Sequence, residues 1–360
     1  MKEKIGSFQL IYDPPIGGAE IAQHRLYSKI SDKYDIQVHC FMENFMSFKR
    51  FISFEKDGVT IHRCNAALFK QNLERFIDVN RPKCIITYLI GSDVVADIAH
   101  KKRIPIIFFA HGIFEDICGM NPIKCQEDIS KCDFNNCMNK NKIMIHRIKY
   151  SRCKYIVCNS EFTYEMFMRF FPEFEDKCII LYPDFNFDLF EYDGNIKNEM
   201  NIFAVNSHPL KGSDFIVSLA KKYPSINISY AGCDFKTGES FGCKNIKALG
   251  RITREEMKDC FQRSSVTIIP TSLNETFCGT AYESILCGTP VISTRKGNLP
   301  NIVQDGITGR IMDDLSIDSW MDKIKAYSMM RVQKDFVDDI RFRLKNKTDT
   351  TELIHLIEGI

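Results

Sequence analysis

Short apolar runs rich in β-branched residues recur along the whole chain, with polar loops and helical periodicities between them. Such nearly continuous runs are typical of strands that are buried on both faces of a parallel sheet. In the first half we predict strands at residues 5–12, 36–42, 59–63, 84–90, 104–110, 155–158 and 179–181. In the second half we predict them at residues 202–205, 226–231, 246–249, 266–271 and 290–294. Strands that alternate with helices indicate an α/β fold.

Capping residues mark several helix starts. Ser160 precedes the helical pattern of residues 161–170 and is expected to cap it. Thr253 and Glu256 have the spacing of a capping box, so a helix is expected to begin between them. The last part of the chain, residues 316–360, is largely helical by pattern.

Residues 266–294 are the most informative segment, because they combine a strand, a polar loop, a helix and a second strand. The helix is predicted at about residues 279–287 and ends at Gly288, a residue type that commonly terminates helices. The loop carries Glu275, and the helix carries Glu283 eight residues later. N–H groups at a helix start bind anions, and carboxylates accept from hydroxyl groups, so the segment indicates a nucleotide-sugar site.

The pattern E-x7-E followed by C-G-T-P-V resembles the retaining glycosyltransferases of family 4. The resemblance implies the GT-B fold, in which two Rossmann-like domains with parallel sheets face a central cleft. It also implies that Glu275 lies near the transferred sugar and that Glu283 binds the ribose hydroxyls. The other donor contacts that it implies in this segment are Phe277, Cys278, Gly279 and Thr280.

Two earlier loops extend the implied donor site. Lys211, in a Lys-Gly pair before a helix, matches the family's lysine that contacts the donor diphosphate. A fixed ammonium there stabilises the charge that a pyrophosphate leaving group accumulates. The family commonly has Arg five residues earlier, where this chain has Asn206, so phosphate binding is expected to depend more on Lys211, with His208 or Arg251 compensating. The loop that contains Arg251 and Ile252 corresponds to the family's contact with the nucleotide base.

The first half of the chain contributes a glycine pair and a histidine. Gly17 and Gly18 follow the first predicted strand and precede a helix, and they resemble the family's first loop, which lies across the cleft from the nucleotide. A plain tight turn is the alternative. His111 follows the predicted strand 104–110, at the strand end where open α/β sheets place ligands. In the resembled family a His at this place contacts the donor sugar near the reacting carbon; a structural His is the alternative.

The length of 360 residues suggests two domains. Residues 183–195 resemble the family's interdomain linker. We therefore place an acceptor-side domain at residues 1–188 and a nucleotide-sugar-binding domain at residues 189–339. The last helix, at about residues 340–360, is expected to pack back on the first domain.

Cysteine usage indicates a reducing compartment, because fifteen cysteines are scattered over a long chain. Four of them fall within twenty residues and lack the C-x2-C pair of common zinc sites: Cys118, Cys125, Cys132 and Cys137. Three interpretations of this cluster remain open, namely free thiols, a structural metal site and disulfides.

Two segments have compositions that suit contact with lipid. Residues 41–56 interleave apolar and basic side chains, so they form either a surface for a bilayer or acceptor lipid, or an ordinary loop and helix. Residues 138–154 contain six basic residues and no acidic one. They form either a solvated helix face or a patch for anionic lipid or a phosphorylated acceptor.

Charge and hydropathy exclude several classes of protein. The chain has 48 basic and 46 acidic residues, so no overall field attracts it to nucleic acid. No uninterrupted apolar stretch approaches the ~18 residues that span a membrane. The start lacks the pattern of a secretion signal. We therefore expect a cytoplasmic protein, with the inner face of the membrane as an alternative site of peripheral contact.

The expected activity is transfer of a sugar, with retention, from a nucleotide sugar to a glycan, lipid-linked or other acceptor in cell-envelope or polysaccharide synthesis. UDP is the expected nucleotide, from family frequency. The expected catalytic residues are His111, Glu275 and Lys211, and no metal or cofactor is required, since Lys211 and helix-terminal amides neutralise charge. Two alternatives stay open: a GT-B-type nucleotide-sugar epimerase, and a catalytically silent sugar-nucleotide-binding subunit, which Asn206 makes conceivable.

Overall fold

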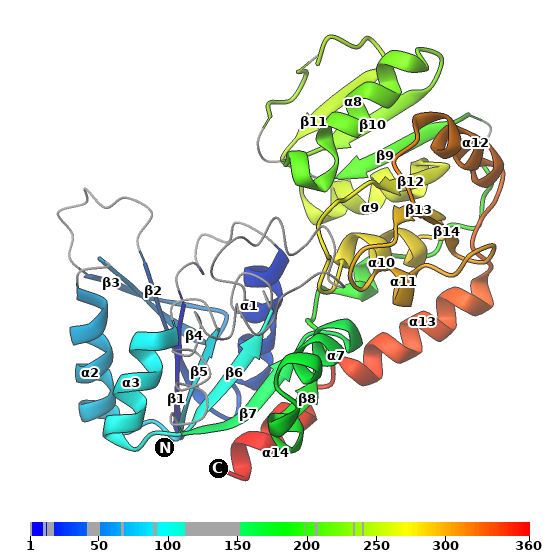
Figure 1. The fold of residues 1–360 in the computed structure, drawn as a ribbon. Helices are drawn as coiled ribbons and strands as arrows, with labels where there is room; N and C mark the ends of the chain where they lie inside the picture. The colour runs from blue at the N-terminus through cyan, green and yellow to red at the C-terminus, as the bar shows by residue number, and fades with distance from the viewer. Residues whose placement is uncertain are drawn as a thin grey trace. The chain divides into compact units, whose positions relative to one another are not determined.

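The chain folds into two compact units, each with its own sheet (Figure 1). The computed structural model describes residues 2–9, 12, 18–41, 51–65, 68–88, 92–111, 152–197, 199–205, 208–232, 235–239 and 241–360. Unit 1 comprises Met1–Phe185 and Lys347–Ile360, and unit 2 comprises Asn186–Asn346. The boundaries expected from the sequence fall after residues 188 and 339, three residues after the first of these boundaries and seven residues before the second. In the part of the chain that is described, no helix has the length and hydrophobicity needed to cross a membrane.

Unit 1 contains an eight-stranded sheet in the order β3-β4-β2-β1-β5-β6-β7-β8. Its strands are β1 (Lys4–Phe8), β2 (Asp35–Phe41), β3 (Phe51–Lys56), β4 (Val59–Cys64), β5 (Cys84–Tyr88), β6 (Ile106–Ala110), β7 (Cys153–Cys158) and β8 (Cys178–Ile180). Neighbouring strands are parallel except β3 and β4, which form an antiparallel hairpin through Asp57 and Gly58, both with positive φ. The loop-and-helix interpretation is therefore wrong for residues 51–56, which form β3; residues 42–50 lie outside the described residues.

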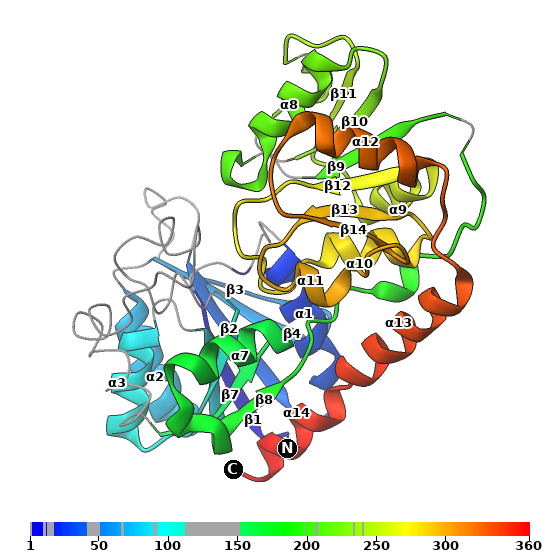
Figure 2. The same ribbon diagram turned by 45° about the vertical axis from the view of Figure 1, so that its right-hand side comes forward.

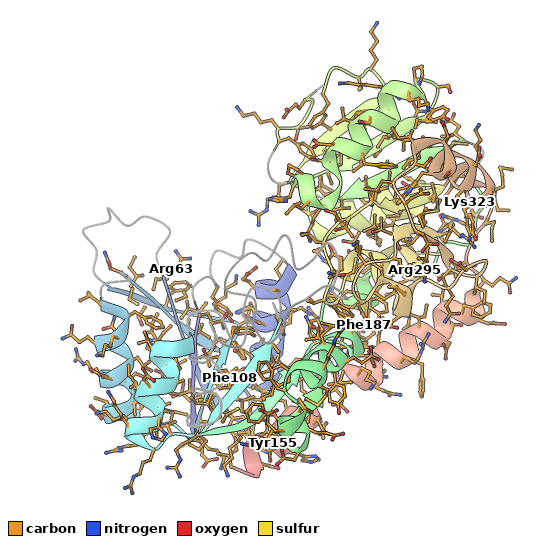
Figure 3. The ribbon with its side chains drawn as sticks, viewed as in Figure 1. Arg63, Phe108, Tyr155, Phe187, Arg295 and Lys323 are labelled. Carbon is orange, nitrogen blue, oxygen red and sulfur yellow. The ribbon has the colours of Figure 1, made fainter. Side chains whose placement is uncertain are left out.

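Helices cover both faces of this sheet. They are α1 (Gly18–Ile30), α2 (Phe69–Asn80), α3 (Ser92–Lys102), α7 (Glu161–Phe170) and α14 (Thr350–Glu358). Helices α2, α3 and α7 share one hydrophobic cluster, in which Phe108 of β6 is fully buried (Figure 3). Helices α1 and α14 share the cluster on the opposite face, and Figure 2 shows α14 near α1. The predicted cap of α7 is confirmed, since Ser160 Oγ accepts from the N–H of Thr163 at 3.1 Å.

Unit 2 contains a six-stranded, fully parallel sheet in the order β11-β10-β9-β12-β13-β14. Its strands are β9 (Asn201–Val205), β10 (Asn227–Ala231), β11 (Ile246–Gly250), β12 (Val266–Ile269), β13 (Val291–Thr294) and β14 (Gly309–Met312). Every strand predicted from the apolar runs is present in one of the two sheets with boundaries shifted by a few residues, and β3 and β14 are additions. Because the strands of unit 2 are parallel, all of their carboxyl ends lie at one edge of the sheet.

The helices of unit 2 also lie on both faces of its sheet. They are α8 (Ser213–Lys222), α9 (Arg254–Arg263), α10 (Gly279–Leu286), α11 (Leu299–Ile302), α12 (Ile317–Ser328) and α13 (Lys334–Lys347), with short 3-10 turns at η4 (Phe187–Leu189) and η5 (Pro209–Lys211). On one face, Trp320 of α12 packs against Phe215 of α8, with ring centroids 4.8 Å apart. On the other face, Phe261 of α9 packs edge-on against Phe203 of β9, with ring centroids 5.0 Å apart. The predicted capping box of Thr253 and Glu256 is confirmed.

Arg331, which follows α12, ties several segments of unit 2 together from the interior. Its side chain is 4% exposed. Nε donates to the carbonyl of Asn195 at 2.8 Å, and Nη2 donates to the carbonyl of Gln262 at 2.9 Å. Nη1 donates to the carbonyl of Ser264 at 3.0 Å and to Thr289 Oγ1 at 2.5 Å. One guanidinium thus connects the start of the unit, the end of α9 and the turn before β13.

We expect Arg331→Met to destabilise unit 2 by about 3 kcal/mol, because four acceptors, three of them in partly buried hydrogen bonds, lose a charged donor. Trp320 is the single tryptophan of the chain and is fully buried in unit 2, so its fluorescence reports the unfolding of this unit. The substitution should lower Tm by roughly 2–4 °C for each kcal/mol of unfolding free energy that is lost.

The control variant is Arg343→Met. Arg343 is exposed and pairs at 3.0 Å with Asp339 on the same helix, so its loss should change stability by no more than about 0.5 kcal/mol. Equal Tm decreases in the two variants would show that the hydrogen bonds of Arg331 do not stabilise unit 2.

Candidate functional site

The carboxyl ends of β9 and β12 mark the switch point of the sheet in unit 2. From β9 the chain continues to β10 and β11 on one side, and it then returns to β12 on the other side of β9. The loops after β9 and β12 therefore diverge from one edge, which is where open α/β sheets bind ligands. The first of these loops carries Lys211 and the second carries Glu275.

Short backbone contacts join the two loops. Ser272 donates to the carbonyl of Leu210 from its backbone N–H and from its hydroxyl, each at 2.8 Å. Gly212 has a φ of 93°, and a Cβ at this position would lie 2.4 Å from the carbonyl oxygen of Pro270. Glycine alone permits this approach without displacing the backbone. The contact holds Lys211, the last residue of η5, beside the loop after β12.

Lys211 and Glu275 form an ion pair across these loops, with Nζ 3.2 Å from Oε1. Their side chains are 33% and 13% exposed, so the ammonium is the more accessible partner. The structure therefore brings together two residues that the sequence assigned to one donor site. A partly exposed ammonium next to a carboxylate can contact an anionic ligand while Glu275 accepts from a hydroxyl.

The turn after β13 supports the Glu275 loop from another side. The N–H of Asn298 donates to the carbonyl of Glu275 at 2.7 Å, and its Nδ2 donates to the carbonyl of Phe277 at 3.2 Å. The N–H of Gly297 donates to Asn274 Oδ1 at 3.1 Å. Asn298 is fully buried, so these bonds are shielded from water. The backbone on both sides of Glu275 is thereby fixed.

The start of α10 carries the remaining predicted donor contacts of this segment. Phe277 is buried, whereas Cys278, Gly279 and Thr280 are half-buried. Cys278 has a φ of 61°, a left-handed conformation that turns the loop into the helix. Gly279 lies beside Glu283, since a Cβ at this position would be in van der Waals contact with Oε1 at 3.4 Å. Burial raises the pKa of the Cys278 thiol, which therefore stays neutral.

Glu283 lies on α10 and is only 3% exposed. Arg254, the first residue of α9, donates from Nη1 to Oε1 of Glu283 at 2.6 Å. Oε2 of Glu283 is buried and has no hydrogen-bond partner among the described residues. Burial raises the pKa of Glu283, and the ion pair with Arg254 opposes that rise. The second oxygen is thus an acceptor that needs a donor from a ligand or from water.

The predicted base-contact loop follows β11, the edge strand of the sheet. Gly250 has a φ of 66°, and its carbonyl accepts from the N–H of Gly232 at 3.0 Å. Arg251 is exposed and Ile252 is half-buried. Because α9 begins directly after this loop, the same segment delivers Arg254 to Glu283.

His111 belongs to unit 1, where it directly follows β6. It lines a small pocket together with Gln23 and Leu26 of α1, Tyr88 of β5 and Asp184. The rings of Tyr88 and His111 meet edge to face, with centroids 5.1 Å apart. Burial lowers the pKa of His111 to about 4, so the imidazole is neutral near pH 7.

Several predicted residues lie outside the described residues. They are Gly17, Asn206, Cys118, Cys125, Cys132 and Cys137, together with most of residues 138–154. Gly18 is described and is the first residue of α1. Within the described ranges, no group of three or more His, Cys, Asp or Glu side chains is arranged to hold a metal ion.

Sequence reasoning missed three residues that shape the site, namely Arg254, Gly297 and Asn298. The capping box located the start of α9, but it carried no information about which residue of α10 faces Arg254. No local pattern connects Gly297 and Asn298 with Glu275, because the loop that they contact lies more than twenty residues away in the sequence.

Gly297→Ala should disturb the Glu275 loop and destabilise unit 2. Gly297 has a φ of 58°, and a Cβ there would lie 2.2 Å from the oxygen and 2.4 Å from the nitrogen of Glu275. The backbone of the loop would have to move, in addition to the ~1–2 kcal/mol that a left-handed alanine costs. We expect a total loss above about 2 kcal/mol, measured by thermal unfolding at Trp320.

Gly306→Ala is the matched control. Gly306 also has a positive φ, of 79°, but no atom lies within 4 Å of an added Cβ. The difference between the two variants therefore isolates the contact with Glu275. If both variants lose the same free energy of unfolding, the positive φ of Gly297 explains the whole loss. The contact of the added Cβ with the Glu275 loop then contributes nothing.

Residues 239–335 match the family model described as "Glycosyl transferases group 1". A D-inositol 3-phosphate glycosyltransferase from Mycobacterium avium is 30% identical over 134 residues, which cover 34% of this chain and 31% of that protein. The protein of the same description from Mycolicibacterium smegmatis is 28% identical over 134 residues, with coverage of 34% and 31%. This chain thus spans about a third of the length of the curated relatives that it matches.

Solved structures resemble the chain over nearly its full length. Sucrose-phosphate synthase from Thermosynechococcus elongatus has a TM-score of 0.74 and 14% identity, and 99% of each chain is covered. HepE from Anabaena, solved in complex with UDP-glucose, has a TM-score of 0.68 and 13% identity, with 99% of this chain and 98% of that chain covered. At these identities the likeness shows the fold, and the predicted α/β class is confirmed. The chain therefore has the fold of GT-B glycosyltransferases, and its residues 239–335 match glycosyl transferases group 1.

Proposed function

We propose that this protein is a retaining glycosyltransferase of family 4 that transfers a sugar from a UDP-sugar to a glycan or lipid-linked acceptor, in cell-envelope or polysaccharide synthesis. The observation that carries the proposal is the position of Lys211, Glu275 and Glu283 around the switch point of one parallel sheet. The match to glycosyl transferases group 1 over residues 239–335 includes both carboxylates and supports the same activity.

Each group in unit 2 has a defined task in this proposal. Lys211 neutralises the diphosphate, which gains charge as the glycosyl–phosphate bond breaks. Glu275 accepts from hydroxyls of the transferred sugar, and the unpartnered Oε2 of Glu283 accepts from the ribose hydroxyls. Arg251 and Ile252 contact the base. The acceptor hydroxyl oxygen replaces the nucleotide on the anomeric carbon, whose configuration is retained.

No metal or other cofactor is needed for this chemistry. Lys211 supplies a full positive charge, and the backbone N–H groups at the start of α10 supply partial positive charge. His111 contacts the transferred sugar in the proposal. Because burial lowers the pKa of His111 to about 4, its ring acts as a neutral hydrogen-bonding group at neutral pH.

The choice of UDP is supported by the structural neighbours. HepE from Anabaena was solved with UDP-glucose and with UDP. The neighbouring starch synthase IV from Arabidopsis thaliana was solved with ADP, so the nucleotide has to be tested directly. The name of the curated relatives, D-inositol 3-phosphate glycosyltransferase, makes that phosphorylated polyol one acceptor to include in transfer assays.

The proposal predicts stabilisation by one class of nucleotide. UDP, GDP, ADP and UDP-glucose are added in turn, and unfolding is followed at Trp320, which lies in the unit that binds the donor. A ligand at about 100 times its Kd should stabilise by about 2.7 kcal/mol. We expect UDP and UDP-glucose to raise Tm by several degrees. No response to any of the four would contradict the proposal.

Turnover separates the proposed enzyme from the two alternatives. A glycosyltransferase releases UDP from the donor, by hydrolysis or by transfer to an acceptor. An epimerase converts the donor into an isomer that NMR detects. A catalytically silent subunit binds the nucleotide sugar and leaves it chemically unchanged.

Lys211→Ala and His111→Ala should affect binding and turnover differently. Lys211→Ala should weaken UDP binding by about tenfold or more and also lower kcat, because the diphosphate is charged before and during bond cleavage. His111 lies in unit 1, so its loss should leave the Kd for UDP within about twofold. It should lower kcat on the order of 10²-fold, because its interaction is made with the reacting sugar.

Calorimetry with UDP and steady-state kinetics measure the two effects. Lys221→Ala is the control for loss of a lysine, since Lys221 is exposed on α8. If His111→Ala lost UDP binding and kept its turnover, the roles assigned to the two residues would be wrong.

A further inference from the structure

The buried carboxylate of Glu283 is only half satisfied by the protein. Oε1 accepts from Arg254 Nη1 at 2.6 Å, whereas Oε2 has no hydrogen-bond partner among the described residues. Glu283 is 3% exposed, so bulk water does not solvate the second oxygen. A buried carboxylate oxygen without a donor is costly unless a ligand supplies one.

Arg254 is itself held in place by its surroundings. The capping box of Thr253 and Glu256 fixes the first turn of α9, from which Arg254 projects. Its guanidinium carbon lies 4.8 Å from the ring centroid of Phe190, a cation–π contact. Phe190 is fully buried, and its carbonyl accepts from Arg341 Nη2 at 2.7 Å. The side chain that contacts Glu283 is therefore preorganised.

We propose that Arg254 is a positioning residue for Glu283, which it orients through Oε1 so that Oε2 stays free to accept from the hydroxyl groups of a bound nucleotide. The inference rests on the proposed function for the identity of the ligand, but the contact between the two side chains does not depend on it. Arg254 acts through Glu283 and needs no contact of its own with the substrate.

The charge of Glu283 depends on this pair. Burial raises the pKa of Glu283, and Arg254 supplies the charge and the hydrogen bond that oppose the rise. The thiols at both ends of α10 are neutral, because burial raises the pKa of Cys278 and of Cys287. The charged groups beyond these thiols are Lys211 and Glu275 at one end and Lys258, Arg331 and Arg341 at the other.

Removal of Arg254 should make ligand binding depend on pH. Without the guanidinium, Glu283 takes up a proton at a higher pH than in the wild type. The protonated carboxyl is a weaker acceptor for ribose hydroxyls, so affinity should fall as the pH falls through the raised pKa. In the wild type the same loss should occur only at lower pH.

The test measures the Kd for UDP between pH 5.5 and 8.5 in Arg254→Met, Arg254→Lys and Glu283→Gln. Arg254→Met keeps an apolar stem beside Phe190 and removes the charge. We expect Arg254→Met to bind UDP about tenfold more weakly than the wild type at pH 6, with a smaller deficit at pH 8. Arg254→Lys should recover part of the affinity, because it keeps the positive charge. The recovery should be incomplete, because lysine lacks the planar guanidinium.

A double variant shows whether Arg254 acts through Glu283. If it does, Arg254→Met should have little further effect in the Glu283→Gln background, and the two losses should not add. Arg263→Met is the matched control, since Arg263 is exposed at the other end of α9. Fully additive losses, or an Arg254→Met variant that binds UDP like the wild type at every pH, would overturn the proposal.

A second readout is independent of any nucleotide. In protein labelled with 13C at the glutamate side-chain carboxyls, the signal that Glu283→Gln removes gives the pKa of Glu283. We expect Arg254→Met to raise this pKa and Arg263→Met to leave it unchanged. An unchanged pKa in Arg254→Met would overturn the proposal. If the wild type bound none of the tested nucleotides, the proposed function would fail, and this titration alone would decide whether Arg254 controls Glu283.

Discussion

The close approach of the loops after β9 and β12 is the constraint on which the site in unit 2 depends. Two donors of Ser272 share the carbonyl of Leu210, and Gly212 leaves no Cβ to keep Pro270 away. These contacts place the ammonium of Lys211 within 3.2 Å of the Glu275 carboxylate. The parallel sheet supplies the two loops at one edge, and the glycine allows their approach.

Burial then determines the electrostatic character of the groups in each unit. In unit 2 it raises the pKa of Glu283 and of the Cys278 thiol, and an ion pair with Arg254 opposes the effect at Glu283 alone. In unit 1 it lowers the pKa of His111 to about 4. The site in unit 2 therefore combines two ion pairs with a neutral thiol, while unit 1 offers an imidazole that is neutral near pH 7.

Local signals along the chain were sufficient to predict most of the strands and several of the helix starts. The apolar runs predicted the buried strands, and Ser160 and the Thr253–Glu256 capping box predicted two helix starts, because each depends on residues within a few positions of one another. Strand β3 was not predicted, since the apolar and basic side chains of residues 51–56 also suit a loop or a helix. These residues form a strand because they pair with β4 through a tight turn at Gly58.

The sequence by itself determined the α/β class and the resemblance to a donor site. It also placed Lys211 and Glu275 on loops, and Glu283 on the helix that follows the second loop. Tertiary structure decided which side chains meet. Arg254 reaches Glu283 because α9 and α10 pack on the same face, and Gly297 supports Glu275 because β13 lies next to β12. Spacing along a chain fixes the element on which a residue lies, but contacts between elements follow from how their faces pack, and no local pattern encodes that packing.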